Sequence, residues 1–145
     1  MWRWTVSEHD MRGKLIEVLR PLDAVSVENR CGPGTPDVNY IGGWMELQWL
    51  RAWPKRPETP VKLDHDLEPQ QRAWLRRRRN RGGAAWVMLQ CRREWLLWYG
   101  EVAAEIIGTA TREELIARCH RYWPNGLNGD ELIGVLRGPE IRPIG

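Results

Sequence analysis

A tight turn at Gly42-Gly43 is the feature of this sequence that most constrains its fold. Strand-forming runs at residues 38–41 and 44–49 flank this pair. Two glycines between such runs are a strong signal for a two-residue β-hairpin turn. Four apolar side chains then share one face of the hairpin, which we expect to pack on the core: Val38, Tyr40, Met45 and Leu47.

The other face of this hairpin is polar and carries two carboxylates. With the glycine pair in the turn, Asn39 faces Glu46 and Asp37 faces Gln48, and these four side chains project from the same face. Asp37 and Glu46 are then diagonal neighbours, with Cα atoms about 7–8 Å apart. Two carboxylates at this separation can bind one divalent ion, and a site made of oxygen ligands suits Mg²⁺. A solvated polar strand face explains the same alternation, so the spacing alone leaves both interpretations open.

Other elements are predicted before and after this hairpin. Ser7 is a candidate N-cap for a helix of about three turns, with Glu8 at the N-terminal end of its apolar stripe. Residues 24–29 alternate like a short strand. Pro69 fits the first turn of a helix that ends near Asn80.

The remainder of the chain predicts a second hairpin followed by helices. Residues 84–91 and 94–99 form the two strands of that hairpin. Thr111 and Asn128 each begin a capping-box pattern, so we expect the tail to be helical.

These elements predict a single α/β domain, a size that suits 145 residues. We expect a central mixed sheet in a helix–strand–hairpin–helix–strand core over residues 1–100. A helical C-terminal extension over residues 101–145 is expected to pack on that core.

Positive charge is concentrated after the first hairpin. Residues 51–81 contain ten Arg or Lys against four Asp or Glu. A basic surface beside an acidic site suits a protein that binds a phosphodiester backbone, which makes DNA the expected partner. Arg51, Lys55 and Arg56 lie on a proline-bounded loop where they can grip DNA. For Arg76, in the run RRRRNR, DNA contact and a solvated helix face are equally consistent with the sequence.

The sequence also bears on the location of the protein. It has no apolar run long enough to cross a membrane, and its N-terminus lacks the apolar region of a secretory signal. Three isolated cysteines are typical of free thiols in a reducing compartment. We therefore expect a cytoplasmic protein.

Two short segments of the first hairpin resemble a known motif. Pro36-Asp37 followed by Glu46-Leu47-Gln48 is similar to the motif of the PD-(D/E)XK nuclease superfamily. That superfamily includes restriction endonucleases, Holliday-junction resolvases and the VRR-NUC group, and the short phage-type members look most similar.

The resemblance extends over residues 7–99 in the order of the expected elements. Glu8 matches an acidic residue that resolvase-like members carry on the first helix, and Gln71 matches a glutamine on the helix after the motif. The resemblance implies a restriction-endonuclease-like fold.

The same resemblance implies an endonuclease that hydrolyses DNA with a water activated by Mg²⁺ or Mn²⁺. Branched or junction DNA is among the substrates that it suggests. Asp37 and Glu46 would bind the metal, with the carbonyl of Leu47 as a backbone ligand. Glu8 would bind a second metal or a water on the first. Many members act as homodimers, which makes a second copy of the chain a further expected partner.

Gln48 departs from this pattern because the superfamily usually has a lysine at that position. A glutamine can position a water but supplies no positive charge. Lys62, or else Lys55 or Arg51, is expected to supply the missing charge. The alternative is a DNA-binding protein of nuclease fold that has weak activity or none.

Two further groups of residues have alternative interpretations. Glu28, on the strand before the motif, is either an additional acidic ligand or an exposed strand residue. His65 lies between Asp64 and Asp66, but three adjacent residues cannot all reach one ion. We therefore expect a loop or cap role for the segment Asp64–Asp66.

Overall fold

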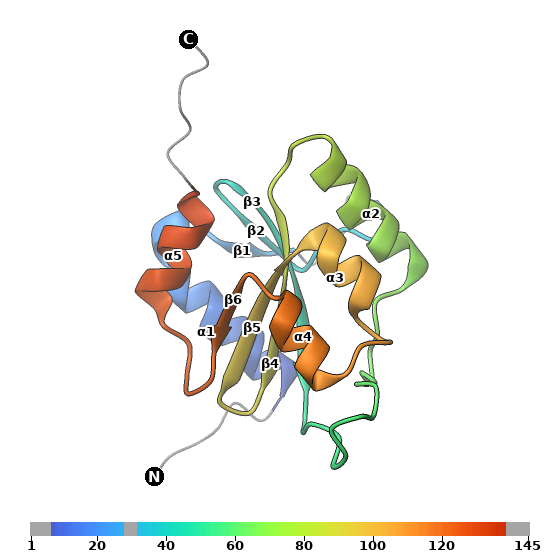
Figure 1. The fold of residues 1–145 in the computed structure, drawn as a ribbon. Coiled ribbons are helices and arrows are strands. Elements are labelled where there is room, and N and C mark those ends of the chain that lie inside the picture. The colour runs from blue at the N-terminus through green and yellow to red at the C-terminus, as the bar shows by residue number, and fades with distance from the viewer. Residues whose placement is uncertain (1–6, 28–31, 139–145) are drawn as a thin grey trace.

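A computed structural model describes residues 7–27 and 32–138 of the chain, which form a mixed α/β structure (Figure 1). Its elements are, in order, α1 (Glu8–Val18), the 3-10 helix η1 (Arg20–Leu22), β1 (Val25–Ser26), β2 (Val38–Tyr40), β3 (Gly43–Leu50), α2 (Pro69–Asn80), β4 (Ala85–Cys91), β5 (Glu94–Tyr99), α3 (Gly100–Ile106), α4 (Arg112–Arg118), β6 (Arg121–Trp123) and α5 (Gly129–Arg137). None of the helices in the described part of the chain has the length and apolar character needed to cross a membrane.

The six strands form one sheet in which their spatial order follows their order in the sequence. All neighbouring strands are antiparallel except β3 and β4, which are parallel. A parallel pair needs a crossover connection, and α2 supplies it. The sheet is therefore mixed, as the sequence predicted.

Helices cover both faces of this sheet (Figure 1). One apolar cluster joins the sheet to α2, α3 and α4, and includes the fully buried Trp98. A second cluster joins the opposite face to α1 and α5, and contains the four apolar residues of the first hairpin. The polar face of β3 therefore lies on the α2 side, where Glu46 and Gln48 are 3% and 4% exposed. The interpretation of a solvated strand face is wrong.

Local signals placed several helix ends correctly. The Ser7 hydroxyl caps α1 by accepting a hydrogen bond from the Asp10 amide at 3.1 Å. The helix predicted from Pro69 to Asn80 has those bounds, and Asn128 caps α5. The structure confirms these predictions. They could be made from the sequence because a cap depends on residues within one turn of the helix end.

The predicted register of the first hairpin is wrong by two residues. Asn39 pairs with Trp44 and Tyr40 with Gly43, so the turn consists of Ile41 and Gly42. Gly43 is a strand residue, and a Cβ atom there would lie 2.5 Å from the Ala84 carbonyl oxygen. The absence of a side chain at Gly43 therefore permits close packing against Ala84, and this residue is not part of the turn.

The tail is not entirely helical. Helix α4 ends at Arg118, and residues 121–123 form β6, which pairs with the outer edge of β5. Trp123 lies opposite Trp95 across this pair. An unpaired β5 would expose a row of backbone donors and acceptors, and β6 satisfies part of that row. Residues of the predicted extension thus contribute to the same sheet as the core.

The short strand predicted at residues 24–29 is only partly described. Within the described residues this strand is β1, Val25–Ser26, which pairs with β2. Glu28, a secondary site candidate, lies outside the described residues, as does Cys31.

Candidate functional site

Asp37, which directly precedes β2, lies opposite Glu46 in the middle of β3. This follows from the corrected register, in which Val38 pairs with Met45. The Asp37 amide donates to Glu46 Oε1 at 3.2 Å, and the Leu47 amide donates to Asp37 Oδ2 at 3.1 Å. The two carboxylates are therefore closer than the predicted diagonal pair, and each is oriented by the partner strand.

Side chains from two helices also hold this acid pair. Gln71 on α2 donates from Nε2 to Glu46 Oε2 at 2.7 Å. Arg12 on α1 approaches Asp37 Oδ1 at 3.4 Å. Asp37 and Glu46 are only 6% and 3% exposed, so these donors offset part of the cost of burying two carboxylates.

The acid pair lines a cleft of about 610 Å³. Helix α1 contributes Glu8 and Arg12 to this cleft, and β3 contributes Leu47 and Gln48. The structure thus brings together all four predicted principal residues and the predicted backbone ligand: Asp37, Glu46, Gln48, Glu8 and Leu47.

Gln48 lies on the wall of this cleft. Its residue is 4% exposed and lines the cleft beside Glu46 and Leu47. A side-chain amide has both donors and an acceptor. Gln48 can therefore bind a group that enters the cleft, such as a water molecule or a phosphate oxygen.

The ligand chemistry of the cleft fits Mg²⁺ or Mn²⁺. All candidate ligands are oxygens, which are the ligands that these ions prefer. Within residues 7–27 and 32–138, no three His, Cys, Asp or Glu side chains are arranged to hold one ion. An ion bound by Asp37 and Glu46 would therefore take its remaining ligands from the backbone, substrate or water, as Mg²⁺ commonly does.

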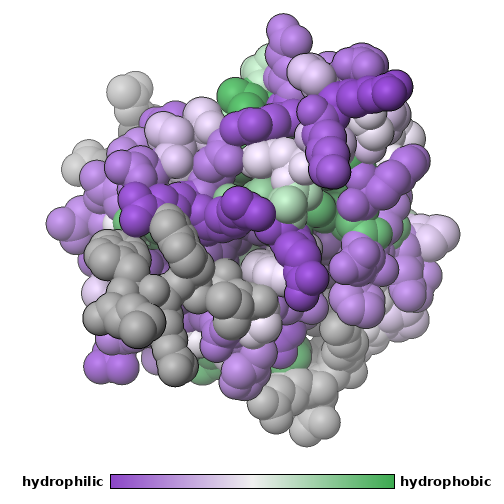
Figure 2. Space-filling view, turned by 90° about the horizontal axis from the view of Figure 1, so that it is seen from below, coloured by the Kyte–Doolittle hydropathy of each residue, from purple (hydrophilic) through white to green (hydrophobic). Residues whose placement is uncertain are grey.

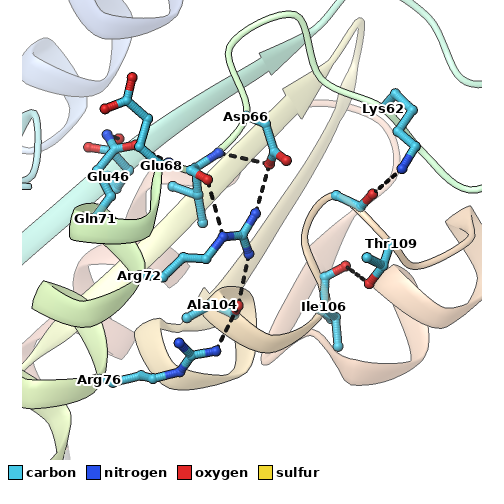
Figure 3. A network of polar contacts seen from close by, with 12 residues as sticks. Glu46, Lys62, Asp66, Glu68, Gln71, Arg72, Arg76, Ala104, Ile106 and Thr109 are labelled. Atoms are coloured by element: carbon cyan, nitrogen blue, oxygen red, sulfur yellow. Dashed lines mark hydrogen bonds and ion pairs between the residues drawn. The ribbon is translucent and has the colours of Figure 1, made fainter.

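The segment Asp64–Asp66 also lines the cleft, which the sequence analysis missed. Asp66 is held in place by Arg72, whose guanidinium lies 3.0 Å from Oδ1 (Figure 3). Asp64 and His65 lie near Glu8 and Gln48 in an adjoining hollow. The sequence did offer one indication that this segment lies at the cleft: it comes shortly before the helix that carries Gln71.

Lys62, the preferred replacement for the missing lysine, points elsewhere. Its Nζ donates to the Gly108 carbonyl at 2.7 Å, on the loop after α3 (Figure 3). Neither Lys62 nor Lys55 nor Arg51 lines the cleft. None of the three thus supplies positive charge in the described arrangement of the site.

The basic residues predicted to contact DNA are distributed over two regions. Lys55 and Arg56 line a separate cavity of about 370 Å³ beside Arg112. They belong, with the exposed Arg51, to the loop at the lower edge of Figure 1, and the surface seen from that side is mostly hydrophilic (Figure 2). Arg76 instead donates to the Ala104 carbonyl at 3.2 Å and joins α2 to α3 (Figure 3).

Much of the arginine run on α2 is engaged within the protein. The Arg78 guanidinium stacks 4.4 Å from the centre of the Trp74 ring, and Arg79 forms an ion pair with Glu101 at 2.7 Å. Arg77 and Arg81 are exposed. The run therefore packs the helix onto its neighbours more than it forms a continuous basic surface.

Gln71 gives a test of how firmly the acid pair is held. Gln71→Leu removes the hydrogen bond to Glu46 and the reciprocal contact in which Gln71 Oε1 accepts from the Glu68 amide at 2.7 Å. We expect the free energy of unfolding to fall by about 2 kcal/mol, from one cap and one charged hydrogen bond. Urea denaturation measures the difference.

Gln70→Leu is the matched control for this change. Gln70 is exposed on the same turn, and its side chain donates a hydrogen bond to the Glu68 carboxylate at 2.6 Å, not to Glu46. Its replacement should change stability by less than about 0.5 kcal/mol. Equal effects of the two variants would show that the contact with Glu46 does not stabilise the fold.

Comparisons of this chain with protein families, with curated proteins and with solved structures find no match. The chemistry of the cleft is therefore the basis of the function proposed next.

Proposed function

We propose that this protein is an endodeoxyribonuclease that depends on Mg²⁺ or Mn²⁺ and has a restriction-endonuclease-like core. The observation that carries the proposal is the buried pair Asp37 and Glu46, held face to face in a cleft that also contains Glu8 and Gln48. Two carboxylates that share one cleft can bind the same divalent ion. The order α1, β1, β2, β3, α2, β4 agrees with the core that the resemblance implies.

Each residue of the cleft has a chemical task in this proposal. Asp37, Glu46 and the Leu47 carbonyl would hold the metal ion, which would acidify a water and neutralise charge on the scissile phosphate. Gln48 would orient the attacking water through its side-chain amide. Glu8 would accept a hydrogen bond or hold a second ion.

The loop that carries Arg51, Lys55 and Arg56 would bind the DNA outside the cleft. Lys55 and Arg56 lie in a cavity that contains three basic side chains and only one acidic side chain, Glu113. Contacts of this kind position a phosphate backbone without reading its sequence. A cytoplasmic location belongs to the same proposal, and the free thiols of Cys91 and Cys119 agree with a reducing compartment.

Cleavage of a labelled DNA panel tests the proposed function. The panel contains linear duplex, single strand, a flap and a four-way junction, each with Mg²⁺, Mn²⁺ or EDTA. We expect cleavage with either metal and a fall to background with EDTA, because the acid pair alone repels phosphate. Gel electrophoresis of the products gives the rate for each substrate.

Two other outcomes separate the alternatives. Binding in a mobility-shift assay without cleavage would favour a DNA-binding protein of the same fold, with Gln48 as the cause. Gln48→Lys would then be expected to gain activity. If the protein neither binds nor cleaves any member of the panel, both the nuclease and the DNA-binding alternative are overturned.

A further inference from the structure

Arg12 is a cation inside the candidate cleft that the sequence analysis did not identify. It lies on α1 one turn after Glu8, so both side chains are on the same side of the helix. Both line the cleft, and Arg12 Nη2 lies 3.4 Å from Asp37 Oδ1. Its side chain is 32% exposed, which leaves it open to a ligand in the cleft.

The lining of the cleft is strongly acidic. Six carboxylates line it: Glu8, Asp37, Glu46, Asp64, Asp66 and Glu68. Arg12 is the one Arg or Lys among the described residues that line it. A phosphodiester entering this cleft would be repelled by the acids, and one divalent ion would offset only part of their charge.

The hydrogen-bonding groups of Arg12 are incompletely used. Its Nε is buried and has no hydrogen-bond partner among the described groups. The contact with Asp37 is 3.4 Å, longer than the 2.7–2.9 Å of a strong charge-assisted hydrogen bond. Arginine has five N–H donors in a fork that matches two phosphate oxygens. The side chain is therefore not arranged mainly as a counter-ion for Asp37.

We propose that Arg12 binds the scissile phosphate and supplies the positive charge that Gln48 lacks. The inference rests on the proposed nuclease function and identifies a phosphate-binding residue within it. It assigns the role to a residue of α1. Arg12 would neutralise charge that develops on the phosphate during hydrolysis.

Substitution of Arg12 tests this assignment. Arg12→Gln should lower kcat/KM for DNA cleavage by about 100-fold, the usual effect of removing one donor that stabilises transition-state charge. Arg12→Lys keeps the charge and should retain part of the activity. Lys14→Gln is the matched control, since it removes the same charge from an exposed position on α1 and should change kcat/KM by less than about twofold.

Two further measurements separate phosphate binding from a structural role. Adding Gln48→Lys to Arg12→Gln should recover about tenfold in kcat/KM, because a cation returns to the cleft from β3. The affinity for Mn²⁺, measured without DNA, should rise in Arg12→Gln because a positive charge beside the acid pair is removed. A damaged fold would lower both quantities.

The possible failures are distinguishable. If the wild-type protein cleaves DNA and Arg12→Gln retains cleavage within about threefold, the assignment is overturned and the nuclease stands. Loss of cleavage together with weaker Mn²⁺ binding and no recovery by Gln48→Lys would also overturn it, in favour of a structural role. If the wild-type protein cleaves no member of the panel, the proposed function and this inference both fail.

Discussion

Asp37→Asn should lower DNA cleavage by about 10³-fold or more while the protein remains folded. Asparagine keeps an oxygen that can accept the hydrogen bond from the Leu47 amide. It loses the negative charge that would bind a divalent ion and that pairs with Arg12. Initial rates with Mg²⁺, measured beside a circular dichroism spectrum, separate lost chemistry from lost structure.

Asp23→Asn is the control for this change. Asp23 is exposed, lies outside the cleft and has a left-handed backbone conformation with a φ of 54°. Asparagine adopts that conformation readily, so neither stability nor cleavage should change measurably. Cleavage by Asp37→Asn at the wild-type rate would exclude the acid pair as the metal-binding site.

Gly34→Ala should lower the free energy of unfolding by about 2–4 kcal/mol, from backbone strain and steric overlap. Gly34 has a φ of +82°, and a Cβ atom there would lie 2.3 Å from the Gln70 carbonyl oxygen. It would also lie 2.9 Å from the Gln71 amide nitrogen. The loop before β2 must therefore move away from α2, which would displace Gln71 from Glu46. Thermal and urea denaturation measure the loss.

Gly82→Ala isolates the strain component of this effect. Gly82 has a similar φ of +86°, but no atom lies within 4 Å of the position of a Cβ. Its replacement should cost about 1–2 kcal/mol, the penalty of a left-handed conformation alone. If the two alanine variants lose the same stability, the close approach of Gly34 to α2 has no energetic weight.

The order and type of most elements could be predicted from the sequence. Ser7, Pro69 and Asn128 mark helix starts that the structure confirms. The second hairpin has nearly the predicted strands. These features depend on groups a few residues apart, so their physical cause lies within the local sequence.

The register of the first hairpin depended on a distant residue. The predicted turn was Gly42-Gly43, whereas the observed turn is Ile41-Gly42 and Gly43 lies against Ala84. Ala84 follows α2 in the sequence, so this close approach is a feature of the tertiary structure and cannot be read from the hairpin sequence. The helical pattern at residues 121–123 was likewise overridden by the open edge of β5.

The candidate site also combines features that the local sequence determines with features that only the tertiary structure determines. The alternation of polar residues along the hairpin by itself determined that Asp37, Glu46 and Gln48 share a face. Only the tertiary structure decided that Arg12 and Asp64–Asp66 line the same cleft and that Lys62 turns away from it. Strand alternation is a property of adjacent residues, whereas the walls of a cleft come from segments that meet through packing of the core.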